Sequence, residues 1–152
     1  MSVESVKKFF EDRGLTDPTF ELGESGATVE LAAQTLNVEQ ARIAKTLAFR
    51  VKDREVLIVT KGDARIDNRK YKEYFKVKAK FLEQDEVAEI TGHPVGGVCP
   101  FGLKKPLDIY IDESLKEFDY VYPAAGSIHT AMKIKPSSIL KLTEAKCIDV
   151  CK

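Results

Sequence analysis

Hydrophobic and polar positions alternate along this chain with two different periods, one typical of helices and the other of strands. In residues 2–14 and 28–37, apolar side chains recur every three or four positions, which predicts two amphipathic helices. Thr28 is the expected N-cap of the second helix, because its hydroxyl can accept a hydrogen bond from a free backbone N–H. Leu31 and Leu36 of this helix are expected to face the core.

Residues 43–63 contain two runs rich in Val, Ile, Leu and Phe around a polar KDRE connection, which predicts a β-hairpin. The remaining patterns predict helices at 68–75 and 84–90, strands at 107–112 and 119–126, and a last strand that stops before Pro136, where a short helix can begin. This order is not a regular βαβ repeat. We therefore expect residues 1–152 to form one α+β domain, with a mixed, mostly antiparallel sheet and helices packed on it.

Length and composition narrow the class of protein. A chain of 152 residues that is 43% hydrophobic can bury a core without disulfides or metals. The longest aliphatic run, residues 56–59, is too short for a membrane span, and the first ten residues lack the apolar core of a signal peptide. Three cysteines without a CxxC motif fit reduced thiols. We expect a cytoplasmic protein that does not bind membranes.

Charge is distributed unevenly along the chain. Lys+Arg and Asp+Glu both total 24, which argues against bulk attraction to nucleic acid and against DNA as a partner. Residues 61–80 nevertheless hold eight basic and three acidic side chains, whereas residues 1–30 hold three basic and seven acidic ones. The basic block could present one face to a polyanion, or it could be a solvated helix with exposed lysines.

Glycine is concentrated in the segment GHPVGGVCPFG, residues 92–102. Gly96 and Gly97 can turn consecutive backbone N–H groups toward one point and so form a cradle for an anion or an oxyanion. The alternative is a tight crossover whose glycines only satisfy a positive φ. A second glycine-bearing segment, AAGSIHTA, precedes the last predicted strand and contains Gly126, Ser127 and His129.

Side-chain chemistry offers few other candidates. Lys45 begins an apolar strand, where a lysine either has a partner or extends from the strand end to solvent. Cys99 would need His93 or His129 as a base to act as a nucleophile, and the alternative is a small residue packed in the loop. We expect no metal site, because the two histidines lie in separate segments, and no nucleotide motif matches.

Several motifs together resemble the YbaK-like family. AKTLAF, VTKGDARID, GHPVGGVCPFGLKK followed by LDIYID, and AAGSIHTAMKI followed by PSSILKLT occur in the order and spacing of that family. Its members are free-standing aminoacyl-tRNA deacylases related to the editing domain inserted in bacterial prolyl-tRNA synthetase. The resemblance implies a compact fold around a curved sheet. It also implies hydrolysis of the ester that joins a wrong amino acid to the acceptor end of a tRNA.

The resemblance assigns roles to particular residues. The family's functional lysine matches Lys45, which would anchor the phosphate of the terminal nucleotide, and Thr46 follows it in the substrate pocket. The glycine-rich loop would stabilise the oxyanion through Gly96 and Gly97. The substrate-binding positions in the two loops correspond to Pro100, Gly102, Gly126, Ser127 and His129. No cofactor is implied, and prolyl-tRNA synthetase is a further candidate partner.

Two substrate clues disagree. Thr46 is typical of cysteinyl-removing relatives, yet those relatives carry basic residues where this chain has Ser127, Ile128 and His129. We expect a small amino acid such as Cys, Ala or Ser, with tRNA-Pro as the first tRNA to test. Two other hypotheses stay open: a non-catalytic module that binds tRNA or a synthetase, and a thiol enzyme that uses Cys99.

Overall fold

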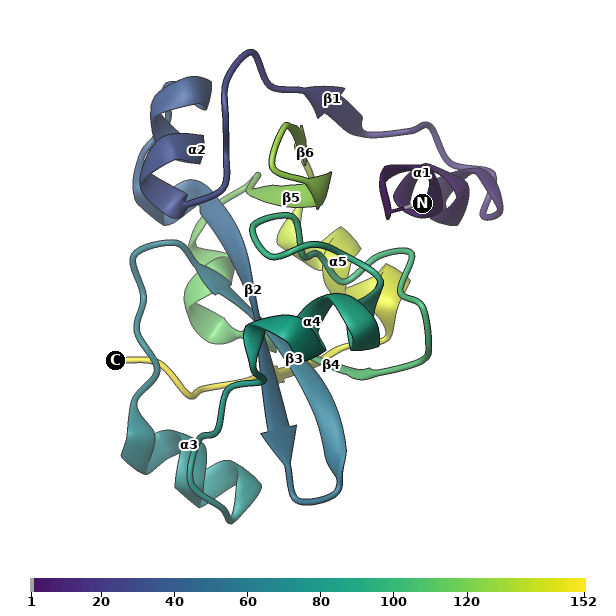
Figure 1. Cartoon of the computed structure of the whole chain (residues 1–152). Helices are drawn as coiled ribbons and strands as arrows, with labels where there is room; N and C mark the ends of the chain where they lie inside the picture. The colour runs from purple at the N-terminus through teal and green to yellow at the C-terminus, as the bar shows by residue number, and fades with distance from the viewer. Residues whose placement is uncertain (1) are drawn as a thin grey trace.

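The computed structural model describes residues 2–152, which form a seven-stranded sheet with helices on both faces (Figure 1). The α-helices are α1 (Ser2–Glu11), α2 (Val29–Leu36), α3 (Asn68–Phe75), α4 (Gln84–Thr91) and α5 (Pro136–Thr143). Short 3₁₀ helices occupy Gln40–Arg42 and Glu113–Glu117. The strands are β1 (Thr19–Glu21), β2 (Ile43–Val51), β3 (Arg54–Lys61), β4 (Asp108–Asp112), β5 (Tyr122–Ser127), β6 (Thr130–Met132) and β7 (Lys146–Ile148).

The sheet has the order β1-β6-β5-β2-β3-β4-β7 and is mixed, as expected. β1 and β6, β6 and β5, and β2 and β3 pair antiparallel, whereas β5 and β2, β3 and β4, and β4 and β7 pair parallel. The predicted hairpin is the longest ladder, with eight residue pairs between β2 and β3. Lys52 has a φ of 58° in its two-residue turn, as such tight hairpin turns require. The α+β class is therefore confirmed.

The central hairpin is covered on both faces, because its two sets of alternating side chains enter different clusters. On β3, Val56 and Ile58 pack with Tyr71 of α3. Leu57 and Val59 belong to clusters on the opposite face, which includes α4, α1 and α5. In Figure 1, α3 lies beside the lower part of the hairpin and α4 crosses in front of it. All four of these β3 side chains are 0% exposed, so β3 is the centre of the core.

The predicted elements are present, with two kinds of difference. The three-residue strands β1 and β7 were not predicted, since three residues cannot display a period. Leu31 is 41% exposed, which corrects the expectation that it faces inward, whereas Leu36 packs against a buried cluster. Thr28 does cap α2, because its hydroxyl accepts a hydrogen bond from the Leu31 N–H at 3.2 Å.

The first helix lies directly on the glycine-rich segment. Gly102 has a φ of +64°, and a Cβ built on it would lie 2.5 Å from the backbone carbon and oxygen of Ser5. A side chain at this position would therefore push α1 away. α1 buries Val6 and Phe10 here, in a cluster that also contains Cys99 and Phe101 of the segment.

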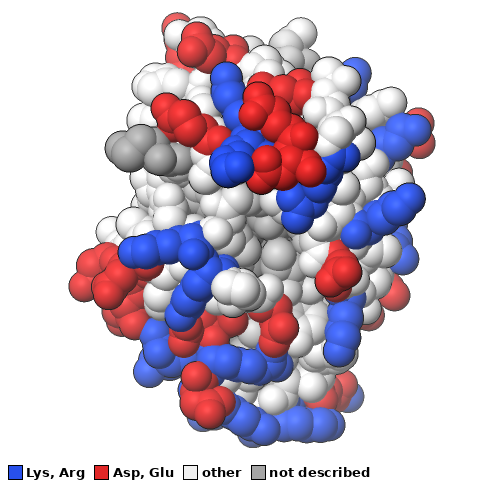
Figure 2. Space-filling model, turned by 90° about the vertical axis from the view of Figure 1, so that its right-hand side faces the viewer, with Lys and Arg blue, Asp and Glu red and all other residues white. Residues whose placement is uncertain are grey.

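The molecular surface carries both signs of charge in close proximity. Figure 2 shows Lys and Arg interspersed with Asp and Glu over the face that lies at the right of Figure 1. This agrees with the equal totals of basic and acidic residues. Within residues 2–152, no helix has the length and apolar character that crossing a bilayer requires.

Replacement of Gly102 tests this close approach. Gly102→Ala should lower the free energy of unfolding by about 2 kcal/mol or more, because it adds a clash with Ser5 to an unfavourable φ. Urea denaturation would measure the change. Gly23→Ala is the matched control, since a Cβ on Gly23 meets no atom within 4 Å. Equal stability of the two variants would contradict the packing described here.

Candidate functional site

Strand β2 has an open edge for three residues. β5 pairs with β2 only at Ile43 and Ala44. Residues 80–82 pair with the same edge from Ala48 onward. The Arg50 N–H donates to the Lys80 carbonyl at 2.8 Å, and the Leu82 N–H donates to the Ala48 carbonyl at 3.0 Å. Residues 45–47 lie between these two neighbours and have no strand beside them on this edge within residues 2–152.

A pocket of about 270 Å³ opens at this gap. β2 contributes Lys45, Thr46 and Leu47, and the remaining walls come from α2, the start of α4, the glycine-rich segment and strands β5 and β6. Most of the lining is apolar, including Leu22, Ala32, Leu36, Ile43, Phe81, Leu82, Val87, Val95, Val98 and Tyr122. A mostly apolar pocket with few polar groups is typical of a small-ligand site.

Thr46 presents polar groups that have no partner among residues 2–152. Alternate residues of an antiparallel strand direct their N–H and C=O groups to the same edge. The Ala48 carbonyl and the Arg50 N–H bond to residues 80–82, so the Thr46 N–H and C=O point to the open part of this edge. The buried Thr46 hydroxyl also has no hydrogen-bond partner within the described chain. A ligand in the pocket could pair with the two backbone groups, whereas the hydroxyl is closed to solvent in this structure.

Lys45 is half-buried and lines the pocket. Its ammonium group donates a hydrogen bond to the Ala64 carbonyl at 2.5 Å, which ties β2 to the loop after β3. Burial lowers the pKa of Lys45, and nearby Arg65 acts in the same direction, whereas Cys151 and Asp63 oppose this change. The lysine is therefore a partly desolvated cation whose described hydrogen-bond partner is one neutral carbonyl.

Gly96 forms part of a tight turn at the pocket wall. The Gly97 N–H donates to the Pro94 carbonyl at 2.9 Å, and Gly96 has a φ of +88° at the third position of this turn, where a type II turn requires a positive value. The N–H groups of Gly96 and Val98, which both line the pocket, have no acceptor in the part of the chain that the structure describes. Gly97 uses its N–H inside the turn, so this N–H, unlike that of Gly96, is not available to a ligand.

The two predicted glycine-bearing loops lie against each other. The Gly126 N–H donates to the Gly97 carbonyl at 2.9 Å. A Cβ on Gly97 would lie 2.6 Å from the Ser127 nitrogen, and one on Gly96 would lie 2.9 Å from the Ile128 side chain. This segment therefore needs glycine for close backbone contact as well as for the positive φ of Gly96.

The other predicted site residues lie outside the pocket lining. Pro100 and Gly102 line a different groove, between α1 and α5, and Gly126 packs against Ser2. Ser127 accepts the His129 N–H at 3.1 Å, and its hydroxyl lies 2.7 Å from the Thr130 hydroxyl. Thr130 itself lines the pocket, whereas His129 is exposed. Lys45, Thr46 and Gly96 are the predicted residues that the structure brings to the pocket.

Cys99 and His93 form a buried pair rather than an accessible one. The thiol lies 3.7 Å from His93 Nε2, and both residues are 0% exposed. His93 Nε2 donates to the Phe101 carbonyl at 2.7 Å, so Nδ1 is the acceptor for the Ser2 hydroxyl at 2.5 Å. Burial raises the pKa of Cys99 to about 12. The thiol is therefore protonated at neutral pH and is not a pocket nucleophile.

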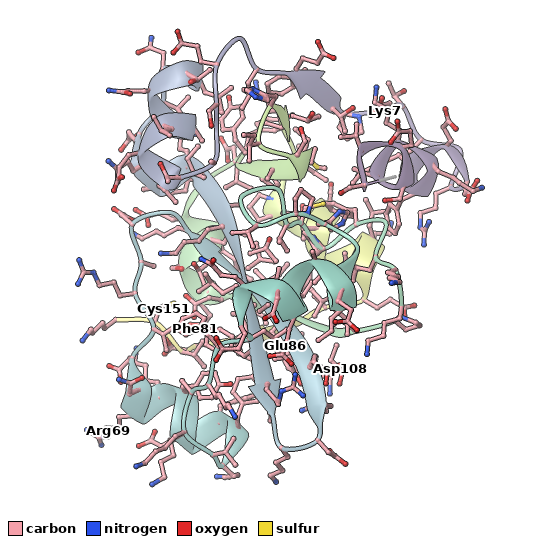
Figure 3. The ribbon with its side chains drawn as sticks, in the orientation of Figure 1. Lys7, Arg69, Phe81, Glu86, Asp108 and Cys151 are labelled. Atoms are coloured by element: carbon pink, nitrogen blue, oxygen red, sulfur yellow. The ribbon has the colours of Figure 1, made fainter. Side chains whose placement is uncertain are left out.

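Phe81 lines the pocket but was not predicted as a site residue. It is 56% exposed, and Figure 3 shows it above α3 and beside the start of α4. The signal that could have identified it is its position, since an aromatic residue directly follows the basic block of residues 61–80. Thr28 and Thr130 are further polar lining residues that the sequence did not single out for the site.

Comparison with known families assigns this chain to one of them. Residues 23–142 match the family described as the aminoacyl-tRNA editing domain. The chain belongs to this family. The match covers most of the 152 residues and confirms the resemblance inferred from the motifs.

Individual relatives agree with this assignment. "Uncharacterized protein YwhH" of Bacillus subtilis is 46% identical and covers 100% of this chain and 98% of its own length. "Putative Cys-tRNA(Pro)/Cys-tRNA(Cys) deacylase EbsC" of Enterococcus faecalis is 28% identical over 86% of this chain and 81% of that protein. The proline–tRNA ligase of Bacillus licheniformis is 32% identical over 59% of this chain, which corresponds to only 16% of the ligase.

A solved structure shows the same fold. The chain described as "a putative trans-editing enzyme for prolyl tRNA synthetase" superposes with a TM-score of 0.90 at 31% identity. The match covers 99% of this chain and 97% of that one. The arrangement of helices and strands is therefore that of the editing-domain family over nearly the whole chain.

The buried side chain of His93 is expected to make the folding stability of the protein fall at acidic pH. Burial lowers the pKa of His93 from its ordinary value of 6.5, so the unfolded chain binds this proton more readily than the folded chain. The contribution of neutral His93 to the free energy of unfolding is therefore complete above pH 6.5, the pKa in the unfolded chain. It is lost as the pH falls toward the lower pKa that His93 has in the folded protein. His93→Gln should therefore lose less stability than the wild type between about pH 7.5 and 5.5 in denaturant titrations. Equal losses would contradict this assignment.

Proposed function

We propose that this protein hydrolyses the ester bond of a mischarged tRNA, acting in trans on tRNA released by a synthetase. The observation that carries the proposal is the pocket at the open edge of β2, where a partly desolvated lysine lies next to unused backbone and hydroxyl groups. Membership of the editing-domain family supports the same reaction class. The cytoplasm, where charged tRNA is made, is the expected compartment.

The pocket residues would divide the work between binding and catalysis. Lys45 would exchange its contact with the Ala64 carbonyl for the phosphate of the terminal nucleotide, because a charged acceptor binds an ammonium more strongly than a neutral one. The Thr46 backbone N–H and C=O, which face the open part of the β2 edge, would hydrogen-bond the ester end of the substrate. The apolar walls would hold the amino-acid side chain and exclude bulk water.

The chemical step requires little from side chains. An attacking water adds to the ester carbonyl carbon, and the bond between this carbon and the ribose oxygen then breaks. The ribose oxygen takes up the proton that the water loses, so the products are the free amino acid and the tRNA hydroxyl. Backbone N–H groups that face the developing oxyanion accelerate such a step by a large factor. Gly96 is the predicted donor whose N–H has no acceptor among the described residues, and Val98 provides a second such N–H in the pocket lining. Gly97 would act by holding the turn in place.

Cys, Ala and Ser esterified to tRNA-Pro are the proposed substrates. One relative is named as a deacylase of Cys-tRNA(Pro) and Cys-tRNA(Cys), which supports testing the cysteinyl ester first. Similarity to proline–tRNA ligases over 90 residues supports tRNA-Pro as the carrier and prolyl-tRNA synthetase as a candidate partner. The pocket volume of about 270 Å³ has room for each of these small side chains.

The proposal predicts a specific loss of activity at Lys45. Lys45→Ala should lower kcat/KM for a mischarged tRNA by about 100-fold or more, because a buried charged contact with the substrate is removed. Release of labelled amino acid from Cys-, Ala- and Ser-charged tRNA-Pro would measure it.

Lys7→Ala is the matched control, since Lys7 is an exposed lysine on α1, and Figure 3 shows it well away from Phe81 and the start of α4. Full activity of Lys45→Ala, with Lys7→Ala and wild type also active, would contradict the proposed role. Absence of hydrolysis of any ester by the wild type, with tRNA still bound, would favour the non-catalytic binding module.

The thiol-enzyme hypothesis leads to a separate prediction. Cys99→Ala should keep full deacylase activity and lose about 1 kcal/mol of folding stability, because the thiol packs in the core. Modification by iodoacetamide at neutral pH should be slow at Cys99, whose pKa is raised to about 12. Loss of activity in a folded Cys99→Ala protein would instead assign the nucleophile to this thiol.

A further inference from the structure

Only part of the basic block at residues 61–80 is neutralised in the folded protein. Three of its cations bond to carboxylates: Lys61 to Glu117, Arg69 to Glu73 and Lys70 to Asp149. Arg65, Lys72, Lys76, Lys78 and Lys80 form no ion pair within residues 2–152, and all five are exposed. The positive charge that folding leaves unpaired is therefore concentrated toward the C-terminal end of the block.

Three of these lysines form a regular arrangement after α3, which we call the lysine strip: Lys76, Lys78 and Lys80. The residues between them, Val77 and Ala79, pack against the cluster that covers the α3 face of the sheet. This alternation anchors the segment through its apolar residues and directs the three ammonium groups outward. The strip is thus a fixed feature of the surface and not a flexible basic tail.

The lysine strip ends at the pocket. Phe81 follows Lys80 and lines the pocket wall, and it pairs with Phe49 of β2 just beyond the open edge. Phe49 and Lys45 lie on the same face of β2, four residues or about 13 Å apart along the strand. The aromatic ring and the pocket lysine are therefore at opposite ends of the open edge.

Phe81 presents an aromatic surface to solvent at this point. Its ring lies 4.4 Å from that of Phe49, between centroids, and is tilted by 31°, so packing within the protein holds one side of it. The side chain is nevertheless 56% exposed. Tyr74, at the other end of the strip, is 44% exposed. Two exposed aromatic residues thus flank three unpaired lysines.

We propose that the lysine strip and Phe81 bind the single-stranded RNA immediately before the esterified nucleotide and guide it into the pocket. The lysines would contact successive phosphates, and a base would stack on Phe81. Cations interleaved with exposed aromatic rings are typical of single-strand binding, because phosphates need charge and every base has a stacking face. The identity of the RNA as a charged tRNA rests on the proposed function. The binding of single-stranded RNA by this surface does not.

Direct binding tests the strip without requiring catalysis. Fluorescence anisotropy of labelled, uncharged tRNA would be measured over a salt series with the triple variant Lys76→Gln, Lys78→Gln, Lys80→Gln. Binding at low salt should weaken by about 10-fold or more, and the slope of log K against log salt should fall by roughly 2, as loss of three single-strand phosphate contacts requires. All three positions are exposed, so the fold should be retained.

A matched triple variant controls for general loss of positive charge. Lys7, Lys104 and Lys141 are exposed lysines that form no ion pair within residues 2–152. Lys104 and Lys141 line the groove between α1 and α5, Lys7 lies on α1 away from Phe81 (Figure 3), and replacement of the three by Gln removes the same net charge. This control should bind tRNA as the wild type does. An equal loss in both triple variants, or no loss in the strip variant, would overturn the proposal.

Kinetics separate failure of this inference from failure of the proposed function. The strip variant should raise KM for charged tRNA without changing kcat, and it should leave hydrolysis of an aminoacyl ester of adenosine alone unchanged. If the wild type hydrolyses both substrates and the strip variant matches it on both, the strip proposal fails and the deacylase function stands. If the wild type hydrolyses neither, the function fails, and the binding experiment still decides on the strip.

Phe81 provides a second, independent variant. Phe81→Leu keeps an apolar contact with Phe49 but removes the flat ring, so KM for charged tRNA should rise by about 10-fold. Phe81→Tyr keeps the ring and should restore the wild-type KM. If Phe81→Leu leaves KM unchanged, Phe81 does not stack on RNA.

Discussion

The open edge of β2 is the constraint on which the rest of the site depends. Backbone groups on a strand edge need partners, and a neighbouring strand normally supplies them. Here β5 leaves β2 after Ala44, and residues 80–82 arrive only at Ala48. The interval is short enough to be enclosed by α2 and the glycine-rich turn, so it becomes a pocket instead of an exposed edge. A continuous ladder at this edge would have left no room for a ligand between Lys45 and Phe81.

The glycine-rich segment has two roles that depend on different glycines. Gly97 and Gly102 allow backbones to approach, at Ser127 and at Ser5, and so they hold the loops and α1 in place. Gly96 adopts the positive φ that a turn at the pocket wall requires, and its N–H has no acceptor within residues 2–152. An aminoacyl ester is already reactive, so an enzyme acting on it needs positioned N–H donors more than a strong side-chain nucleophile. The burial and protonation of Cys99 are consistent with a reaction that does not require a side-chain nucleophile.

Folding also determines which charges remain available to a polyanion. Carboxylates from distant parts of the chain, Glu117 and Asp149, neutralise Lys61 and Lys70, and so they join the end of β3 to the second 3₁₀ helix and α3 to the C-terminal segment. Most of the cations of the basic block that stay unpaired within residues 2–152 follow Lys70 in the sequence. The last of them, Lys80, directly precedes Phe81, which lines the pocket. A protein with no net charge can in this way offer a local basic surface without attracting nucleic acid over its whole area.

The sequence by itself determined the local features and the family. Helical and strand periods located the hairpin, α3 to α5 and the Thr28 cap, because these depend on side chains a few residues apart. The ordered motifs identified the editing-domain family and singled out Lys45, Thr46 and Gly96, which the structure places at the pocket. Only the tertiary structure decided that Gly97 packs against Ser127, that Gly102 faces α1 and that Phe81 lines the pocket. These outcomes depend on which segments distant in sequence meet, and no local pattern encodes that.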